Sequence, residues 1–296
     1  MIQWAAFLYL GVIAWGTSFL WIKIALRELD PVTLVMWRVL FGVLTVAVTI
    51  LVARKRIVWK GKQFWIPILI GCTGTAIPIS MISWAEMRID SGIAGILNGT
   101  MPIWTILIAH FVIHDDKLSW SKISGILIGF FGMYLLLNPE VGVPRDVIGQ
   151  LAVVGAAILY AASTVTAKRF LRGVHSMQIT LPSLLSSLTL MIILTVSSTG
   201  TITIPHKPMT WLACIWMGII GMGLAQQVWF WLIGHWSASR LSMVTYVFPV
   251  AALTLGVIFL GERLSWELIV GGGMIIGGII LVNRAAPART TPIVST

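Results

Sequence analysis

The sequence predicts an all-α, polytopic membrane protein in which ten transmembrane helices form two inverted five-helix repeats around a central cavity. Three observations predict this fold. The 296 residues are 58% hydrophobic and 10% charged, whereas an ordinary soluble domain is roughly 25% charged. Long apolar runs follow one another along the whole chain, and short patterns of the first half recur in the second. Such a chain cannot cover itself with polar side chains, so its expected solvent is lipid.

Ten segments are apolar over the length that crosses a bilayer, which takes about 20 helical residues. The first segment lacks a basic leader and exceeds a signal h-region, so we expect it to remain as a span. The loops are short and leave no room for a soluble catalytic domain. The predicted spans are 4–26, 32–53, 64–86, 91–113, 121–138, 147–171, 176–198, 210–233, 240–260 and 264–283.

The net charge of +10 is distributed between the apolar runs rather than gathered on one face, which argues against a nucleic-acid partner. With a cytoplasmic N-terminus, thirteen of the twenty Lys and Arg residues fall in inner loops and the tail, many of them in "ARKRIVWKGK". The positive-inside rule therefore predicts a multi-pass protein of the inner (plasma) membrane with both termini cytoplasmic.

Metal and cofactor chemistry is not expected. Cys72 and Cys214 both lie in apolar runs and offer neither metal spacing nor a disulfide framework. His110 and His114 are four residues apart on one helix face, but no third ligand lies near them. The chain also has no Walker loop, so we expect no cofactor and no primary pump.

Two nine-residue stretches carry the internal repeat, "WGTSFLWIK" at 15–23 and "YAASTVTAK" at 160–168. They pair Trp15 with Tyr160, Ser18 with Ser163, and Lys23 with Lys168. Further on, "HDDKLSW" (114–120) recurs as "GERLSW" (261–266), each after a span with a proline and before a Gly-rich span that we expect to make close helix contacts.

The repeat divides the chain into halves of about 1–140 and 144–296, joined by the polar stretch "NPEVGVPRD". Each half has five spans, an odd number, so the second half must enter the membrane from the opposite side. Inverted repeats indicate alternating access, with the substrate site at the interface of the halves near the bilayer midplane.

Three stretches carry a family resemblance: "WGTSFLWIKIALRELDPVTLVMWR", "SGIAGILNGTMPIWTILIAHFVIHDDKLSW" and "ASRLSMVTYVFPVAALTLGVIFLGERLSWELIVGGGMIIGGIIL". In combination and order they resemble the EamA-type transporters of the drug/metabolite transporter superfamily, including its aromatic amino acid exporters. The resemblance covers essentially the whole chain. It implies ten helices with both termini inside, a central cavity, and export or exchange of small metabolites such as amino acids. The acidic pair Asp115 and Asp116 departs from the repeat, since Gly261 and Glu262 stand in the second half.

The first helix of each half supplies candidate substrate-binding residues. Trp15 and Ser18 are three residues apart and share a helix face, as do Tyr160 and Ser163. An aromatic ring beside a hydroxyl suits a small-molecule pocket. Trp also anchors spans at the headgroup level, but Trp15 lies near the middle of its span.

The third and eighth spans supply a second set of candidates. Ser80 and Trp84 share one face, and Gln227 and Trp231 share the matching face. A glutamine amide is costly in lipid, so Gln226 or Gln227 should face protein or water, and we favour Gln227 because it shares the face of Trp231. Bonding between helices is the alternative role.

The fourth and ninth spans add Asn98 and Tyr246, which precede Pro102 and Pro249. A proline frees a backbone carbonyl one turn earlier, so a polar group becomes available to a substrate or water. Helix bending for packing is the alternative explanation, and both roles are compatible.

Four charges lie in or beside the spans, namely Lys23, Arg38, Glu86 and Lys168. Such charges are functional candidates by default. Lys23 and Arg38 instead reach the outer headgroups if their side chains snorkel. Glu86 is the candidate for proton coupling, although its position near a span end weakens that role.

Glu262 and Asp116 each begin a Gly-rich span, where a carboxylate favours the positive end of a helix. We therefore expect them to cap helices or to pair with Arg263 and Lys117 rather than to act in chemistry.

The leading functional hypothesis is a secondary exporter of small metabolites, most favourably amino acids including aromatic ones, working by alternating access and not as an enzyme. A lipid-modifying membrane enzyme, a channel, and an exchanger of nucleotide sugars or other metabolites are the alternatives. The expected partners are a small-molecule substrate and membrane lipid. Proton exchange, solute exchange and facilitated flow are all compatible with the sequence, which sets no oligomeric state.

Overall fold

The computed structural model describes most of the chain as helix, and the described residues contain no strand, as predicted. The described residues are 2–54, 61–112, 120–137, 146–236, 238, 241 and 243–284. The elements are α1 (Ile2–Leu8), η1 (Tyr9–Ala14), α2 (Ser18–Ala25), α3 (Pro31–Ala53), α4 (Lys62–Gly71), η2 (Cys72–Ala76), α5 (Ile77–Glu86), α6 (Ser91–Asn98), α7 (Met101–Val112), α8 (Trp120–Leu137), α9 (Val147–Phe170), α10 (Ser176–Thr199), α11 (Pro208–Gly218), η3 (Ile219–Leu224), α12 (Ala225–His235), η4 (Met243–Tyr246), α14 (Val247–Leu255), η5 (Gly256–Leu260) and α15 (Trp266–Arg284).

Seven helical stretches in the described part of the chain are long and apolar enough to cross a membrane. They are Ile2–Ala25, Pro31–Ala53, Phe64–Glu86, Ser91–Val112, Val147–Phe170, Ser176–Thr199 and Pro208–His235. Three shorter apolar helices, Ile123–Gly132, Val247–Leu260 and Leu268–Gly278, fall inside the other three predicted spans. Each of the ten predicted segments therefore contains an apolar helix, and seven of them have the full length of a candidate span.

The helix that forms the second predicted span of each half, α3 or α10, begins with a side-chain cap. At the start of α3, Asp30 Oδ1 accepts hydrogen bonds from the backbone N–H groups of Val32 and Thr33, both at 3.0 Å. At the start of α10, His175 Nδ1 accepts from the Met177 N–H at 3.3 Å. These caps satisfy backbone donors that have no partner within the helix.

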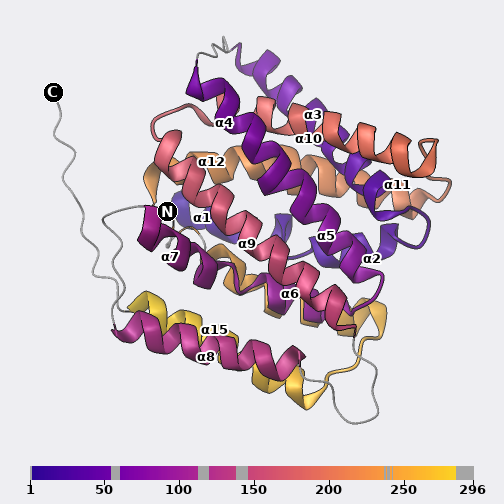
Figure 1. The fold of residues 1–296 in the computed structure, drawn as a ribbon. Coiled ribbons are helices and arrows are strands. Elements are labelled where there is room, and N and C mark those ends of the chain that lie inside the picture. Colours follow the sequence, from indigo (N-terminus) through magenta and orange to yellow (C-terminus); the bar gives the residue numbers. More distant parts are fainter. Residues whose placement is uncertain are drawn as a thin grey trace, which may run out of the picture.

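The helices form one bundle, with α8 and α15 lying side by side along one edge of it (Figure 1). On the opposite side of the view α10 packs on α3 and α4, while α9 crosses the middle and packs on α5, α6 and α7. Helices of the first half thus pack on helices of the second throughout the bundle, so the space between the halves lies at its centre.

The Gly-rich spans make close helix contacts, as predicted, and the structure shows that α8 and α15 make them with each other. A Cβ atom on Gly132 would lie 2.6 Å from the Gly271 carbonyl oxygen, and one on Gly278 would collide with the Gly125 carbonyl oxygen. Small residues allow this approach, and van der Waals packing is a main source of helix association in lipid.

Replacing Gly278 with Ala should therefore destabilise the α8–α15 pair, by about 1–3 kcal/mol as for other overpacking changes. The neighbouring Gly277 is the matched control, because a Cβ there meets no atom within 4 Å. Apparent melting temperatures of the two purified variants in detergent should differ, with Gly278→Ala lower and Gly277→Ala unchanged or higher. Equal melting temperatures would contradict the close packing.

Candidate functional site

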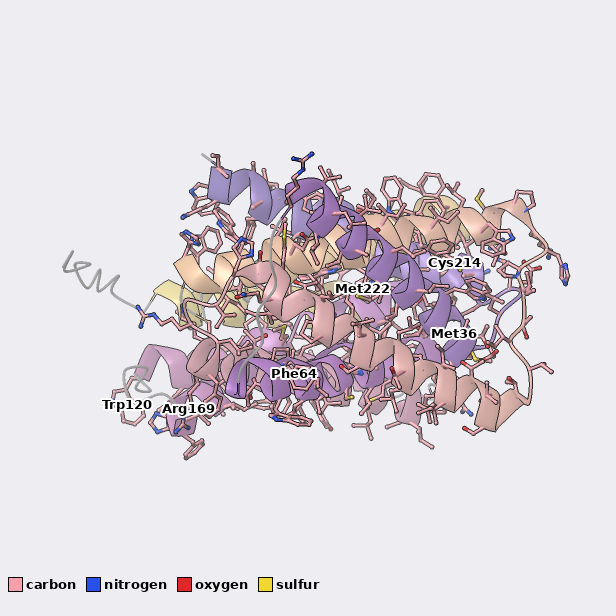
Figure 2. The ribbon with its side chains drawn as sticks, turned by 90° about the horizontal axis from the view of Figure 1, so that it is seen from above. Met36, Phe64, Trp120, Arg169, Cys214 and Met222 are labelled. Carbon is pink, nitrogen blue, oxygen red and sulfur yellow. The ribbon has the colours of Figure 1, made fainter. Side chains whose placement is uncertain are left out.

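A cavity of about 110 Å³ lies at the centre of the bundle, between the two halves. Since a bound water needs roughly 10–15 Å³, the cavity has room for a small solute. In Figure 2 its lining residue Met222 lies in the middle of the bundle, surrounded by helices. The lining residues are Trp15, Ser18, Phe19, Ile22, Arg38, Ile70, Gly74, Thr75, Ile79, Ile82, Asn98, Met101, Tyr160, Ser163, Thr164, Gly221, Met222, Gln226, Trp229, Phe230, Thr245 and Phe248.

The two halves line the cavity with corresponding positions. Eighteen of the 22 lining residues form nine pairs separated by 145 or 147 positions, the separations of the sequence repeat. The pairs are Trp15/Tyr160, Ser18/Ser163, Phe19/Thr164, Gly74/Gly221, Thr75/Met222, Ile79/Gln226, Ile82/Trp229, Asn98/Thr245 and Met101/Phe248. The backbone positions match, but the residues differ in seven of the nine pairs. The two halves therefore contribute equivalent positions with different chemistry.

Trp15 is held by a π-helical turn of the opposite half. Its Nε1 donates to the Gly221 carbonyl oxygen at 2.7 Å, and Tyr9 donates its hydroxyl to the Ile220 carbonyl oxygen, also at 2.7 Å. Both acceptors lie in η3, where π-helical winding interrupts the regular hydrogen-bond ladder. The Trp15 ring packs edge-on against Trp229 at a centroid distance of 5.2 Å. The indole therefore forms a fixed part of the aromatic wall.

The paired serines are both buried at the cavity. Ser18 donates to the Ala14 carbonyl oxygen at 3.0 Å, and Ser163 shares a 3.2 Å hydrogen bond with Thr73. Gly74 makes room for Ser163, since a Cβ on Gly74 would lie 2.5 Å from the Ser163 Cβ.

The paired lysines cap the C-termini of two corresponding helices. Lys23 Nζ donates to the carbonyl oxygens of Glu86 (2.5 Å) and Ile89 (2.7 Å), at the end of α5. Lys168 Nζ donates to the carbonyl oxygens of Ile233 and Trp236, both at 2.6 Å, at the end of α12. A cation at a helix C-terminus satisfies carbonyls that lack intrahelical partners and opposes the negative end of the dipole. This shared contact explains why the sequence repeats the lysine.

Arg38 does not reach the headgroups by snorkelling, which corrects that alternative. It lines the cavity and is 4% exposed. Among the described lining residues it alone carries a formal charge. Its placement follows from α3, where Arg38 stands seven residues beyond Pro31 and hence roughly 10 Å along the helix.

Two buried side-chain oxygens of the cavity have no hydrogen-bond partner, Asn98 Oδ1 and Gln226 Oε1. The Gln226 amide is oriented by its Nε2, which donates to Thr75 Oγ1 at 2.9 Å. Unpaired acceptors inside a membrane protein are costly, which marks them as candidate ligand contacts.

A charged cleft of about 600 Å³ lies beyond the end of α5. Glu262 there accepts hydrogen bonds from the backbone N–H groups of Ser91 (2.8 Å) and Gly92 (3.1 Å), so it caps α6 of the other half. It was predicted to cap a helix, but it caps α6 instead of its own α15. Burial raises the pKa of the nearby Asp90 carboxyl, and the Glu262 charge raises that pKa further. Asp116 and Lys117 lie outside the described residues.

Glu86 borders the same cleft with a side chain that is 0% exposed. Neither of its carboxylate oxygens has a hydrogen-bond partner in the structure, and Lys23 and Arg38 are its attractive charged neighbours. Its role in proton coupling stays a prediction.

Five of the predicted binding residues line the cavity: Trp15, Ser18, Asn98, Tyr160 and Ser163. Four others do not: Ser80, Trp84, Gln227 and Trp231. The Tyr246 side chain lies outside the described residues.

The residues placed away from the cavity have other contacts. The Ser80 hydroxyl bonds to the Ala76 carbonyl oxygen at 2.9 Å, and Arg88 lies 4.4 Å above the Trp84 ring. Gln227 Nε2 donates to the Gly223 carbonyl oxygen at 3.0 Å. Trp231 packs against a neighbouring histidine ring.

Gln226 rather than the preferred Gln227 lines the cavity, and the cavity face lies one residue earlier than expected in both halves, at Ile79 and Gln226. The prediction rested on the helix face that Gln227 shares with Trp231, and in the structure it is Gln226 and Trp229 that line the cavity. Thr75 and Trp229 also line the cavity and were not predicted. Arg38 had a signal in the sequence, since it is a charge well inside a predicted span.

Comparison with known proteins identifies a family match in both halves. The model of the EamA-like transporter family matches residues 2–138 and 147–284. Uncharacterized transporter YoaV of Bacillus subtilis is 23% identical, covering 92% of this chain and 95% of its own. Uncharacterized inner membrane transporter YedA of Escherichia coli K12 is 27% identical, with 92% and 87% covered.

Two further similarities concern a named exporter and a solved fold. A probable terminal-alkyne amino-acid exporter of Streptantibioticus cattleyicolor is 21% identical, covering 97% of this chain and 94% of its own. A crystal structure that is 20% identical has a TM-score of 0.70 and covers 95% of this chain and 94% of its own. At this identity the solved structure supports the fold alone.

The cap formed by Lys168 predicts a stability effect that a neighbouring charge should not share. Lys168→Met should lower stability by about 1.5–3 kcal/mol, because hydrogen bonds to a charged donor are lost and two carbonyls remain unsatisfied. Arg169→Met is the control, because this adjacent cation is exposed. Melting in detergent measures both variants, and an equal loss in the two would contradict the role of Lys168.

Proposed function

Because this chain belongs to the EamA-like transporter family, we propose that it is a secondary transporter that exports small metabolites by alternating access, with amino acids, including aromatic ones, as the favoured substrates. The observation that carries this proposal is the cavity between the halves, which combines aromatic and apolar walls with a set of polar side chains. Small-molecule sites are built in this way.

The paired lining supports ten spans arranged as two inverted repeats. Alternating access by inverted repeats requires that each half offer the same backbone positions to one shared site. The nine position pairs and the equivalent contacts of Lys23 and Lys168 have this relation. We accordingly propose repeats of about 1–140 and 144–296 in the inner membrane, with both termini cytoplasmic.

The proposed substrate-binding residues are the five predicted ones that line the cavity, with Gln226 in place of Gln227. Trp15 and Tyr160 offer ring faces, while Ser18, Asn98 and Ser163 offer polar groups. The similar protein of Streptantibioticus cattleyicolor is described as a probable amino-acid exporter, which favours the same substrate class here.

Proteoliposomes containing the purified protein should show flux of labelled amino acids such as L-phenylalanine or L-leucine that exceeds the flux of protein-free vesicles. Parallel assays with and without an imposed pH gradient would identify proton coupling. Absence of flux for every amino acid and related small metabolite tested would overturn the proposed function.

The two adjacent glutamines provide a matched test of the cavity. Gln226→Leu should reduce the apparent affinity roughly tenfold, because one or two hydrogen bonds to the solute or to Thr75 are lost. Gln227→Leu should leave affinity close to that of the unchanged protein, since this residue does not line the cavity. Concentration-dependent uptake measures both, and the reverse order would place the site elsewhere.

Glu262 should stabilise the contact between the two halves through the hydrogen bonds that it accepts from α6. Glu262→Gln should speed hydrogen–deuterium exchange in the first turn of α6, because the charged acceptor of the Ser91 and Gly92 amides is lost. Asp90→Asn is the control, since Asp90 makes no side-chain cap on α6. Because Asp90 repels Glu262, its neutralisation should leave exchange unchanged or slower. Equally faster exchange in both variants would contradict this role of Glu262.

A further inference from the structure

The guanidinium of Arg38 has more donors than the protein uses. Its Nη2 donates to Ser18 Oγ over a long 3.4 Å, its Nη1 lies 3.8 Å from the Met217 sulfur, and its Nε has no partner. A guanidinium offers five N–H donors in a planar fork. Lys23 and Lys168, in contrast, each hold two carbonyl oxygens at short distance. Arg38 is therefore poorly satisfied by the protein alone.

Arg38 has no counterpart in the second half. The separation of 145 positions that relates Asp30 to His175 places Ser183 opposite Arg38, and Ser183 does not line the cavity. The lysine occurs twice because a helix C-terminus has to be capped in each half. A buried charge present once is not explained by a structural requirement of the repeat.

Glu86 attracts Arg38 electrostatically but does not pair with it. Within the described part of the chain, the ion pair within 4.0 Å is that of Arg88 with Asp146. An anion that entered the cavity would therefore meet a cation with free donors.

Hydrogen-bond acceptors without a donor lie in the same cavity as the Arg38 donors. Asn98 Oδ1 and Gln226 Oε1 are buried acceptors without a donor, and both line the space that Arg38 lines. A solute that satisfies all three groups must carry an anion and a hydrogen-bond donor. The remaining walls, which include Trp15, Trp229 and other apolar side chains, suit a hydrophobic or aromatic remainder.

We propose that Arg38 binds the carboxylate of the transported solute, while Asn98 and Gln226 accept hydrogen bonds from its ammonium group. The site thereby recognises a zwitterionic amino acid through both charged ends. This inference rests on the proposed transport function. A carboxylate matches the planar fork with two parallel hydrogen bonds, whereas a diphosphate would place at least two negative charges against one arginine.

The test compares solutes that differ in the carboxylate. Proteoliposomes with unchanged protein take up labelled L-phenylalanine and, in parallel, phenethylamine, which lacks the carboxylate. The unchanged protein should prefer L-phenylalanine. Arg38→Gln should weaken its apparent affinity roughly ten- to a hundredfold, in line with loss of charge-assisted hydrogen bonds, and should not weaken that for phenethylamine. Arg38→Lys should retain part of the affinity, because it keeps the charge but loses the fork.

Controls separate the outcomes. Arg88→Gln removes an exposed arginine outside the cavity and should not change the preference. If Arg38→Gln does not fold, competition assays with the unchanged protein test the carboxylate assignment instead. Phenylacetate should then inhibit L-phenylalanine uptake more than phenyl phosphate does. Stronger inhibition by phenyl phosphate, or an equal effect of Arg38→Gln on both labelled solutes, would overturn the carboxylate assignment while leaving transport intact. Absence of any flux would instead overturn the proposed function.

Discussion

The membrane interior offers no water to unpaired backbone groups, and this constraint shapes the centre of the structure. Helices near the cavity are interrupted by π-helical turns or end inside the bundle, so their carbonyl oxygens need partners from elsewhere. Side chains of the first span supply them: Trp15 and Tyr9 donate to η3, and Lys23 donates to the end of α5. Lys168 has the same task at the end of α12. These contacts hold an irregular backbone around a space that stays open.

The buried polar groups fall into two classes, those that are hydrogen-bonded to the protein and those that lack a partner in it. Polar groups that occur in both halves, such as the two lysines, are hydrogen-bonded to the protein. Arg38 occurs once and keeps free donors, and the buried oxygens of Asn98 and Gln226 have no donor. The repeated lysines thus support the fold, whereas the polar groups without a partner are the ones that remain available to a ligand. The two halves provide equivalent positions around the cavity, and most of those positions carry different side chains.

Much of the organisation could be predicted because it depends on local composition. Apolar run lengths located the helices, and the glycines of 125–132 and 271–278 indicated close helix contacts, although not that α8 and α15 contact each other. The pairing of Trp15 with Tyr160 and of Ser18 with Ser163 identified cavity residues, since corresponding positions of two repeats meet at one interface. Lys23 and Lys168 were paired correctly, although their helix-capping contacts were not anticipated.

By itself the sequence determined an all-helical membrane protein with an internal repeat, since hydropathy and repeated patterns are properties of neighbouring residues. Tertiary structure alone decided which face of each helix meets the cavity. Gln226 and Trp229, three residues apart on one face of α12, line the cavity, whereas Gln227 and Trp231 do not. It also decided that Glu262 caps α6, a contact between segments 170 residues apart that no local pattern encodes. Long-range contacts of this kind depend on packing, which single-sequence periodicity does not specify.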